Sequence, residues 1–305
     1  IIGERAFAGN ENIDCVVLPE TVREIRNEAF CDCTSMQKIN LPAGIMHMGA
    51  AAFENCVKLL RIELPDIRKI EQSVFNRCHK LSEVKLPEGL EEIGDLAFYQ
   101  CLSLRVIDFP VSLKSIGKLA FYKTQSIKEI VLPEHIQMAG SNVFTLSGVE
   151  KATVCCELKD SGCDIFSQCR RLKVLTFEEG VTHIPDKIAF NSSNLKHVNL
   201  PDSLISIGKN AFEGTIFLNN RELPVVNRIF LDGRRMEGDV VIPDHITGIA
   251  GGAFYGNDKI TSVALPENLK NIGARAFCGC TGLKEVTMPP GITEIKEGTF
   301  AYCGL

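Results

Sequence analysis

A phenylalanine returns along this chain at a nearly constant spacing. Thirteen of the 17 phenylalanines follow one another at steps of 22 to 24 residues, apart from a single step of 42. A period in this range, with apolar residues at fixed positions inside it, is typical of a solenoid in which each repeat forms one coil. The recurring residues are Phe7, Phe30, Phe53, Phe75, Phe98, Phe121, Phe144, Phe166, Phe190, Phe212, Phe254, Phe277 and Phe300.

The rest of the repeat keeps the same period. Residues 81–101 show the full unit, Leu-x-x-Val-x-Leu-Pro-x-x-Leu-x-x-Ile-Gly-x-x-Ala-Phe-x-x-Cys. A Leu-Pro pair, or an equivalent apolar residue before proline, marks most units: Leu18-Pro19, Leu41-Pro42, Leu64-Pro65, Leu86-Pro87, Phe109-Pro110, Leu132-Pro133, Leu200-Pro201, Leu223-Pro224, Ile242-Pro243, Leu265-Pro266 and Met288-Pro289.

Each part of the unit predicts a local structure. The alternation in Val84-Lys85-Leu86 favours a short strand with one face inward. The proline that follows ends the ladder locally, because it has no amide donor. The Ala-Phe-x-x-Cys portion is too short for an independent helix, so we expect one helical turn there, and the Ile-Gly pair before it is interpreted as a turn. Parallel strands stacked at about 4.8 Å give a body roughly 60 Å long.

These landmarks resemble the leucine-rich repeats of the BspA-like bacterial surface proteins. The resemblance covers nearly the whole chain. It implies an α/β fold: a right-handed, horseshoe-like solenoid with a parallel β-sheet on the concave side and short helical turns on the other. It also implies secreted or surface-displayed proteins that bind other proteins or host cells.

Composition excludes several classes of partner. The net charge is −5 and the sequence has no run of basic residues, which argues against nucleic acid or an anionic membrane as the main partner. No apolar run approaches the length of a membrane-spanning helix, and no signal peptide is present. Because the chain starts and stops inside a repeat, we expect it to belong to a longer protein in which the signal and the anchor lie outside these residues.

The 13 cysteines follow the repeat more than a disulfide framework. Seven of them stand three residues after the repeat phenylalanine, where other units have Ser, Thr or Asn. We therefore expect small, buried, reduced side chains that donate to carbonyls at a turn. A metal site at Cys155, Cys156, Cys163 and Cys169 is the weaker alternative, because the spacing is no known zinc pattern. The seven are Cys33, Cys56, Cys78, Cys101, Cys169, Cys280 and Cys303.

The step of 42 residues predicts a boundary between two arrays, 1–226 and 227–305. Residues 228–243 are interpreted as two short strands around the turn Asp232-Gly233, forming a β-hairpin unit that opens the second array. A single continuous solenoid is the alternative.

No catalytic motif and no cofactor site are found in the sequence, so we expect a protein without enzymatic activity. The outward positions of the strands are the candidate binding face. They include the charged and polar residues Arg61, Glu63, Glu83, Lys85, Asp108, Glu129, Lys151, His197 and Asn199. A solvated ladder of alternating charges, with no ligand, is the alternative interpretation of these positions.

We expect a monomeric extracellular or cell-surface module that binds a protein partner, with host cell-surface and extracellular matrix proteins as candidates. The competing hypothesis is a structural spacer that displays other domains. A carbohydrate-binding surface is a third hypothesis, but it requires exposed aromatic platforms, and the chain has no Trp and four Tyr.

Overall fold

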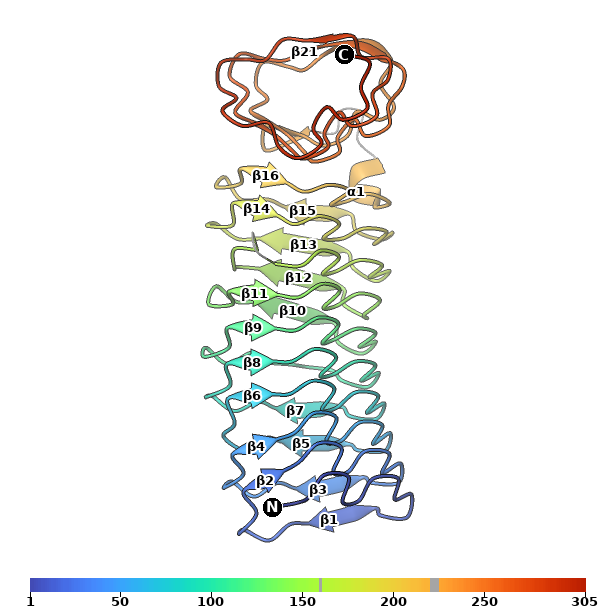
Figure 1. The fold of residues 1–305 in the computed structure, drawn as a ribbon, viewed down its shortest axis with the longest axis vertical. Helices are drawn as coiled ribbons and strands as arrows, with labels where there is room; N and C mark the ends of the chain where they lie inside the picture. Colours follow the sequence, from blue (N-terminus) through green and yellow to red (C-terminus); the bar gives the residue numbers. More distant parts are fainter. Residues whose placement is uncertain (159–160, 220–224) are drawn as a thin grey trace.

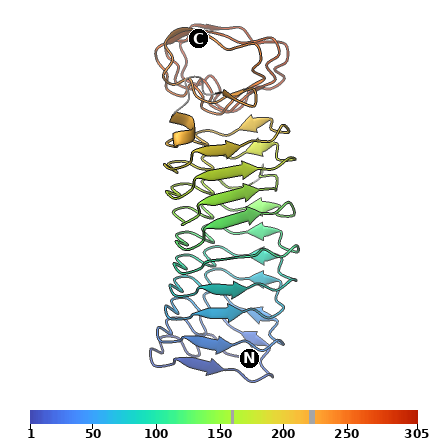
Figure 2. The same ribbon diagram turned by 180° about the vertical axis from the view of Figure 1, so that it is seen from behind.

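A computed structural model describes residues 1–158, 161–219 and 225–305. The chain winds into stacked coils, and most coils contribute two short strands, one on each of two sides of the stack (Figures 1 and 2). The strand pairs are parallel, with the sole exception among the described residues of β17 and β18. The predicted landmark Leu223-Pro224 lies outside the described residues.

The longer strands of residues 1–219 occupy the predicted segment before the Leu-Pro pair. In β5 and β7 the central residue is buried and its neighbours face outward, as the alternation of the sequence predicts. We call the surface that the longer strands form the long-strand face. The strands are β1 (Cys15–Val17), β3 (Lys38–Asn40), β5 (Arg61–Glu63), β7 (Glu83–Lys85), β10 (Glu129–Leu132), β12 (Lys151–Val154), β13 (Val174–Phe177) and β15 (His197–Asn199).

A second column of two-residue strands lies at the Ile-Gly position, which the sequence analysis interpreted as a turn. Each of these strands ends with an inward apolar residue that pairs with its equivalent one coil away, as Ile93 does with Ile116. The strands are β2 (Glu24–Ile25), β4 (His47–Met48), β6 (Lys69–Ile70), β8 (Glu92–Ile93), β9 (Ser115–Ile116), β11 (Met138–Ala139), β14 (His183–Ile184) and β16 (Ser206–Ile207).

Five of these strands, β4, β8, β9, β11 and β16, are followed by a glycine that close packing requires. A methyl group on Gly117 would lie 2.5 Å from the backbone nitrogen of Asp95 in the preceding coil, and one on Gly94 would lie 2.8 Å from the carbonyl oxygen of Ile70. Neither glycine has a positive φ. Of the two roles that glycine commonly has, close approach of the backbone is therefore the one that applies here.

The predicted helical turns are wrong. In the described chain the one α-helix is α1 (Ile216–Asn219). The segment around Phe98 consists of tight turns, because Leu96 and Gln100 have φ values of 58° and 57°, outside the helical region. Alternate amides donate to the next coil, with Phe98 N 2.8 Å from the oxygen of Ala120, and the amides between them donate within the coil, as Tyr99 N does to Leu96 O at 3.1 Å. The fold is thus a parallel β-solenoid with almost no helix.

The phenylalanines form two stacked runs of rings. The first extends from Phe7 to Phe166, with centroids 5.0 to 5.7 Å apart. The second comprises Phe230, Phe254, Phe277 and Phe300. Phe230 restores the period inside the step of 42 residues, although the sequence analysis did not assign it to the repeat. Phe190 is half-buried and Phe212 meets Phe217 edge-on at 5.3 Å.

The cysteine column confirms the expected role of these thiols. Each Sγ donates to the carbonyl of the repeat phenylalanine one coil earlier, as Cys56 does to Phe30 at 3.2 Å and Cys101 to Phe75 at 3.2 Å. Burial raises the pKa of Cys169 to about 11 and that of Cys280 to about 12. All thirteen cysteines are described, and all are free thiols.

Residues 225–305 form a second stack. Its short column contains β18 (Ile229–Phe230), β20 (Gly248–Ile249) and β22 (Asn271–Ile272), and β17 (Val225–Val226) joins its edge. Its long column contains β19 (Gly238–Val241), β21 (Ile260–Ala264) and β23 (Glu285–Val286). In Figure 1 the first stack stands upright, whereas the second is seen along its own axis, so the coils change direction after β16.

The hairpin that opens this stack differs from the predicted one. Its strands are β17 and β18, and the turn between them is Asn227-Arg228, with φ values of 44° and 61°. Positive φ at both central residues is typical of a type I′ turn. Asp232-Gly233 joins β18 to β19, which belong to different sheets. A methyl group on Gly233 would lie 2.1 Å from a ring carbon of Phe254, so this glycine is needed for packing.

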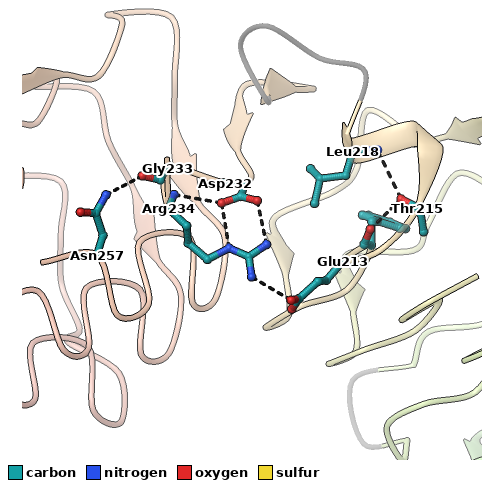
Figure 3. Close-up of polar contacts among 8 residues, drawn as sticks. Glu213, Thr215, Leu218, Asp232, Gly233, Arg234 and Asn257 are labelled. Carbon is teal, nitrogen blue, oxygen red and sulfur yellow. Dashed lines mark hydrogen bonds and ion pairs between the residues drawn. The ribbon is translucent and has the colours of Figure 1, made fainter. Parts of the chain in front are cut away.

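The two stacks meet through a half-buried ion-pair cluster (Figure 3). The guanidinium of Arg234 lies 2.8 Å from Asp232 in its own stack and 3.0 Å from Glu213 in the first stack. The hydrogen bonds from Arg234 to Asp232 raise the pKa of the guanidinium above its usual range. Beside this cluster, the Lys209 ammonium lies 3.6 Å from the ring centre of Tyr255, and Gly251 N donates to Ile207 O at 2.9 Å.

Candidate binding face

The nine residues predicted as a binding face are all exposed. Eight of them occupy outward positions on β5, β7, β10, β12 and β15, and the strand register aligns Arg61 with Glu83 and Glu129 with Lys151. Asp108 lies in the coil between β7 and β10, where Val106 makes an isolated bridge to Glu83. Coil stacking thus brings these residues onto one side of the molecule.

The alternating charges of this face are mostly unpaired. Lys85 Nζ donates to Glu63 Oε1 at 2.6 Å, which raises the pKa of Lys85. Asn199 Nδ2 donates to Thr176 Oγ1 at 3.0 Å. The other six predicted residues make no side-chain hydrogen bond or ion pair with any described residue. The expected ladder of charge pairs is therefore reduced to one pair.

A groove of about 1050 Å³ lies on this face where the sheet is interrupted. In the described part of the chain, β10 pairs with β12 on one side and with no strand on the other. The groove is lined there by residues 105–109, 125–126, 128–131 and 133, which include the predicted Asp108 and Glu129, and by Arg171.

The floor of this groove, named here the Val106 groove, is apolar. The Val106 and Val131 side chains are 60% and 52% exposed. Phe109, which replaces the leucine of the Leu-Pro pair, lines the groove with its half-buried ring, which also meets Phe121 edge-on at 5.8 Å. Exposed valines beside a half-buried ring form an apolar surface, and covering it by a partner contributes favourably to the free energy of binding.

A smaller groove of about 490 Å³ lies at the other interruption of the sheet, between β3 and β5. It is lined by four of the predicted residues, Arg61, Glu63, Glu83 and Lys85. The remaining three, Lys151, His197 and Asn199, line neither groove. The structure therefore divides the predicted face into two grooves and a flat sheet.

The sequence analysis missed a basic rim along one edge of this face. We define the basic rim as the lysines and arginines among the four residues that precede each long strand from β5 to β15. The four residues before Val106, which stands where the intervening coil has no named strand, are included. The same segments contain one acidic residue, Glu150. The rim consists of Lys58, Lys80, Arg105, Lys128, Arg170, Arg171, Lys173 and Lys196, all exposed.

Contacts between coils confirm that rim residues are neighbours. Glu150 accepts from Lys128 at 3.1 Å and from Lys173 at 2.8 Å, which lowers the pKa of its carboxyl to about 2. Arg105, Lys128 and Arg171 line the same groove. Apart from Lys128 and Lys173, the rim residues form no ion pair with any described residue. The rim leaves no run in the sequence, because its members are about one repeat apart.

Away from this face, Glu157, Thr182 and His183 form a polar cluster. Thr182 Oγ1 lies 2.6 Å from both Glu157 Oε2 and His183 Nδ1, and Thr182 N also donates to Glu157 Oε2 at 2.7 Å. Burial raises the pKa of Glu157, but the bonds from Thr182 outweigh it and lower the pKa overall. With the backbone amide and the hydroxyl of Thr182 on the same carboxylate oxygen, the arrangement is that of a side chain that caps a loop.

The described residues contain no group of three or more His, Cys, Asp or Glu side chains placed to hold a metal ion. Nor does any helix among them have the length and apolar character needed to cross a bilayer.

Comparison with solved structures shows similar solenoids. A leucine-rich repeat protein from Bacteroides ovatus is 26% identical, with a TM-score of 0.63 over 92% of this chain and 80% of that one. A leucine-rich cell surface protein from Faecalibacterium prausnitzii is 22% identical, with a TM-score of 0.52 over 92% and 80% of the two chains. The second likeness concerns the fold alone.

A search of curated proteins finds no match to this chain. The family model described as the BspA type leucine-rich repeat region matches residues 1–117, 91–219 and 227–305, which is most of the sequence. Together with the repeat, the stacked phenylalanines and the parallel strands, this match shows that the chain belongs to the BspA-type leucine-rich repeat family.

Proposed function

We propose that this chain is a non-enzymatic, extracellular protein-interaction module that binds its partner through the long-strand face. The observation that supports this most is the Val106 groove, where exposed valines lie beside charged side chains that have no partner in the chain. Apolar area at the centre and polar groups at the edge are the usual composition of a protein interface.

The family supports the same class of function, because leucine-rich repeat proteins typically act as protein-interaction modules. The F. prausnitzii protein of similar fold is described as a cell surface protein. By analogy, we place this chain on a bacterial cell surface or in the extracellular space, as a monomer, with cell-surface and matrix proteins of a host as the candidate partners.

The second candidate is a structural spacer that holds other domains away from the surface. The long, continuous stack of coils in residues 1–219 favours it, since such a stack is stiff without any ligand. A spacer, however, does not need an apolar groove on an otherwise charged face.

Binding to immobilised, purified matrix and cell-surface proteins tests the proposal. The wild-type chain is compared with a variant of the small groove, Arg61→Glu with Lys85→Glu, and a variant of the Val106 groove, Val106→Asp with Val131→Asp. All four side chains are exposed, so folding is preserved and is checked by circular dichroism. We expect saturable binding that the Val106 groove variant loses; equal binding by all three proteins would rule out the long-strand face.

A further inference from the structure

Building on the proposed protein-binding function, we propose that the Val106 groove and the basic rim together bind an extended, acidic segment of the partner protein that inserts an apolar side chain. Three features of the same region support it: its basic side chains, its apolar floor and the extent of the groove across neighbouring coils.

Basic residues outnumber acidic ones in this region, although the chain carries a net charge of −5. The rim consists of eight basic residues, with Glu150 as the one acidic residue in the same segments, and the groove is lined by Arg105, Lys128 and Arg171 against Asp108 and Glu129. Arg105 and Arg171, which line the groove, have no ion pair among the described residues. Guanidinium groups with free donors bind carboxylates through two parallel hydrogen bonds, so acidic side chains are the natural complement of this edge.

The groove floor separates a polypeptide from a polyanionic glycan. A sulfated glycan would need the basic rim alone, whereas Val106, Val131 and Phe109 offer an apolar surface directly beside it. A protein segment in which acidic and apolar residues alternate satisfies both, since alternate side chains of an extended chain point to opposite sides.

The groove crosses several coils, from Arg105 past Val131 to Arg171, and this favours an extended segment. Toward the C-terminal coils β10 is paired with β12. There Lys151 N donates to Lys128 O at 3.1 Å, and Cys155 N donates to Leu132 O at 2.8 Å. On the side of residues 105–109, no strand within the described ranges pairs with it. Residues 105–109 of the neighbouring coil occupy that side, so a bound segment lies over the outward side chains of the groove and does not extend the sheet.

Fluorescence anisotropy with defined peptides tests the inference on the full chain. The probe is a short labelled peptide in which glutamate and leucine alternate. Two control peptides replace leucine by serine or glutamate by lysine, and a sulfated oligosaccharide serves as a competitor. The test variants are Arg105→Glu with Arg171→Glu, and Val131→Ser. The matched control is Lys270→Glu with Lys284→Glu, which reverses two exposed charges on the second stack.

We expect the Glu/Leu peptide to bind with an affinity that falls as salt is raised, and the Arg105/Arg171 reversal to weaken it about tenfold. Val131→Ser is expected to weaken it about threefold to tenfold through lost apolar contact, and the control variant not at all. The Lys/Leu peptide should fail to bind.

Three results would overturn the inference. Equal binding of the Glu/Ser and Glu/Leu peptides, with displacement by the sulfated oligosaccharide, would identify a general polyanion site. Absence of peptide binding, together with groove-dependent binding of whole proteins in the preceding experiment, would remove the acidic segment and leave the proposed function standing. Loss of binding in both experiments would instead reject the face itself.

Discussion

At the scale of single residues, the stacked phenylalanines fill the centre of each coil. Phe98 is fully buried between Phe75 and Phe121, with ring centroids at 5.4 and 5.2 Å. The thiol of Cys101 satisfies the carbonyl oxygen of Phe75 in the turn beside it. A ring and a small donor therefore recur together, which explains why the column after phenylalanine accepts Cys, Ser, Thr and Asn but no large side chain.

Truncation of one ring tests this description. Phe98→Ala removes a side chain that is buried on both sides, so we expect the free energy of unfolding to fall by about 3 to 5 kcal/mol. Phe7→Ala is the matched control, because Phe7 is 37% exposed and contacts a ring on one side only. Urea unfolding followed by circular dichroism measures both; similar losses for the two variants would contradict the stacked core.

At the scale of the coil, the backbones approach most closely where the short strands end. Gly117 faces the backbone of Gly94 and Asp95 at 2.5 Å from its added methyl position. A side chain on Gly117 would clash with that backbone. The Ile-Gly pairs are therefore positions of close approach between coils, although Arg26, Glu71 and Pro185 follow the equivalent strands β2, β6 and β14.

Gly117→Ala should lower the stability of the protein by about 1 to 3 kcal/mol, because the methyl group overpacks against backbone that cannot move alone. At Gly3 a methyl group meets nothing within 4 Å, so Gly3→Ala serves as the control. Thermal unfolding of the two variants gives the comparison, and an unchanged Gly117→Ala protein would show that the coils are not packed this closely.

At the scale of the whole molecule, the Arg234 cluster and the change of direction after β16 define how the stacks are joined. Two hydrophobic clusters fill the described chain, and Ile229, Leu231 and Ala250 of the second stack belong to the cluster of the first. We propose the arrays 1–226 and 227–305 as the two units, noting that this boundary falls in the turn of the β17–β18 hairpin. The right-handed turn and the concave placement of the strands stay predictions.

Arg234→Ala tests this junction. Its removal leaves Glu213 and Asp232 without their shared cation, so we expect a loss of about 1 to 3 kcal/mol and a separate, earlier unfolding transition of the second stack. Arg275→Ala, which breaks an exposed pair with Glu297, should change stability by no more than about 1 kcal/mol. Differential scanning calorimetry resolves the transitions. A single transition shifted equally by both variants would mean that the cluster does not join the stacks.

The sequence predicted the coil, the strands before the Leu-Pro pairs and the thiol column, because each is set by residues that recur at one position. It did not predict the tight turns around Phe98, since the positive φ of Leu96 and Gln100 is imposed by hydrogen bonds to the next coil. The sequence also predicted a hairpin turn at Asp232-Gly233. In the structure Gly233 is needed because it packs against the ring of Phe254, and the hairpin turn lies at Asn227-Arg228.

The candidate site was predicted in part for a related reason. Outward residues such as Glu63 and Lys85 follow from the alternation of a strand, and their ion pair follows from the register. The basic rim was missed because Arg105, Lys128 and Arg171 are far apart in the sequence and the net charge is negative. Aligning the repeats and examining the residues before each strand would have revealed it.

The central claim is that side chains one repeat apart meet on a single surface, and oxidative cross-linking tests it most directly. Glu63 and Lys85 are register partners on adjacent strands, so their Cα atoms should be about 5 Å apart, within the range of a disulfide. Glu63→Cys with Lys85→Cys should form a disulfide under mild oxidation, mapped by mass spectrometry. Glu63→Cys with Asp108→Cys, two coils apart, should not. Cross-linking of the distant pair, or failure of the adjacent pair in the folded protein, would contradict the stacked coils and every surface built on them.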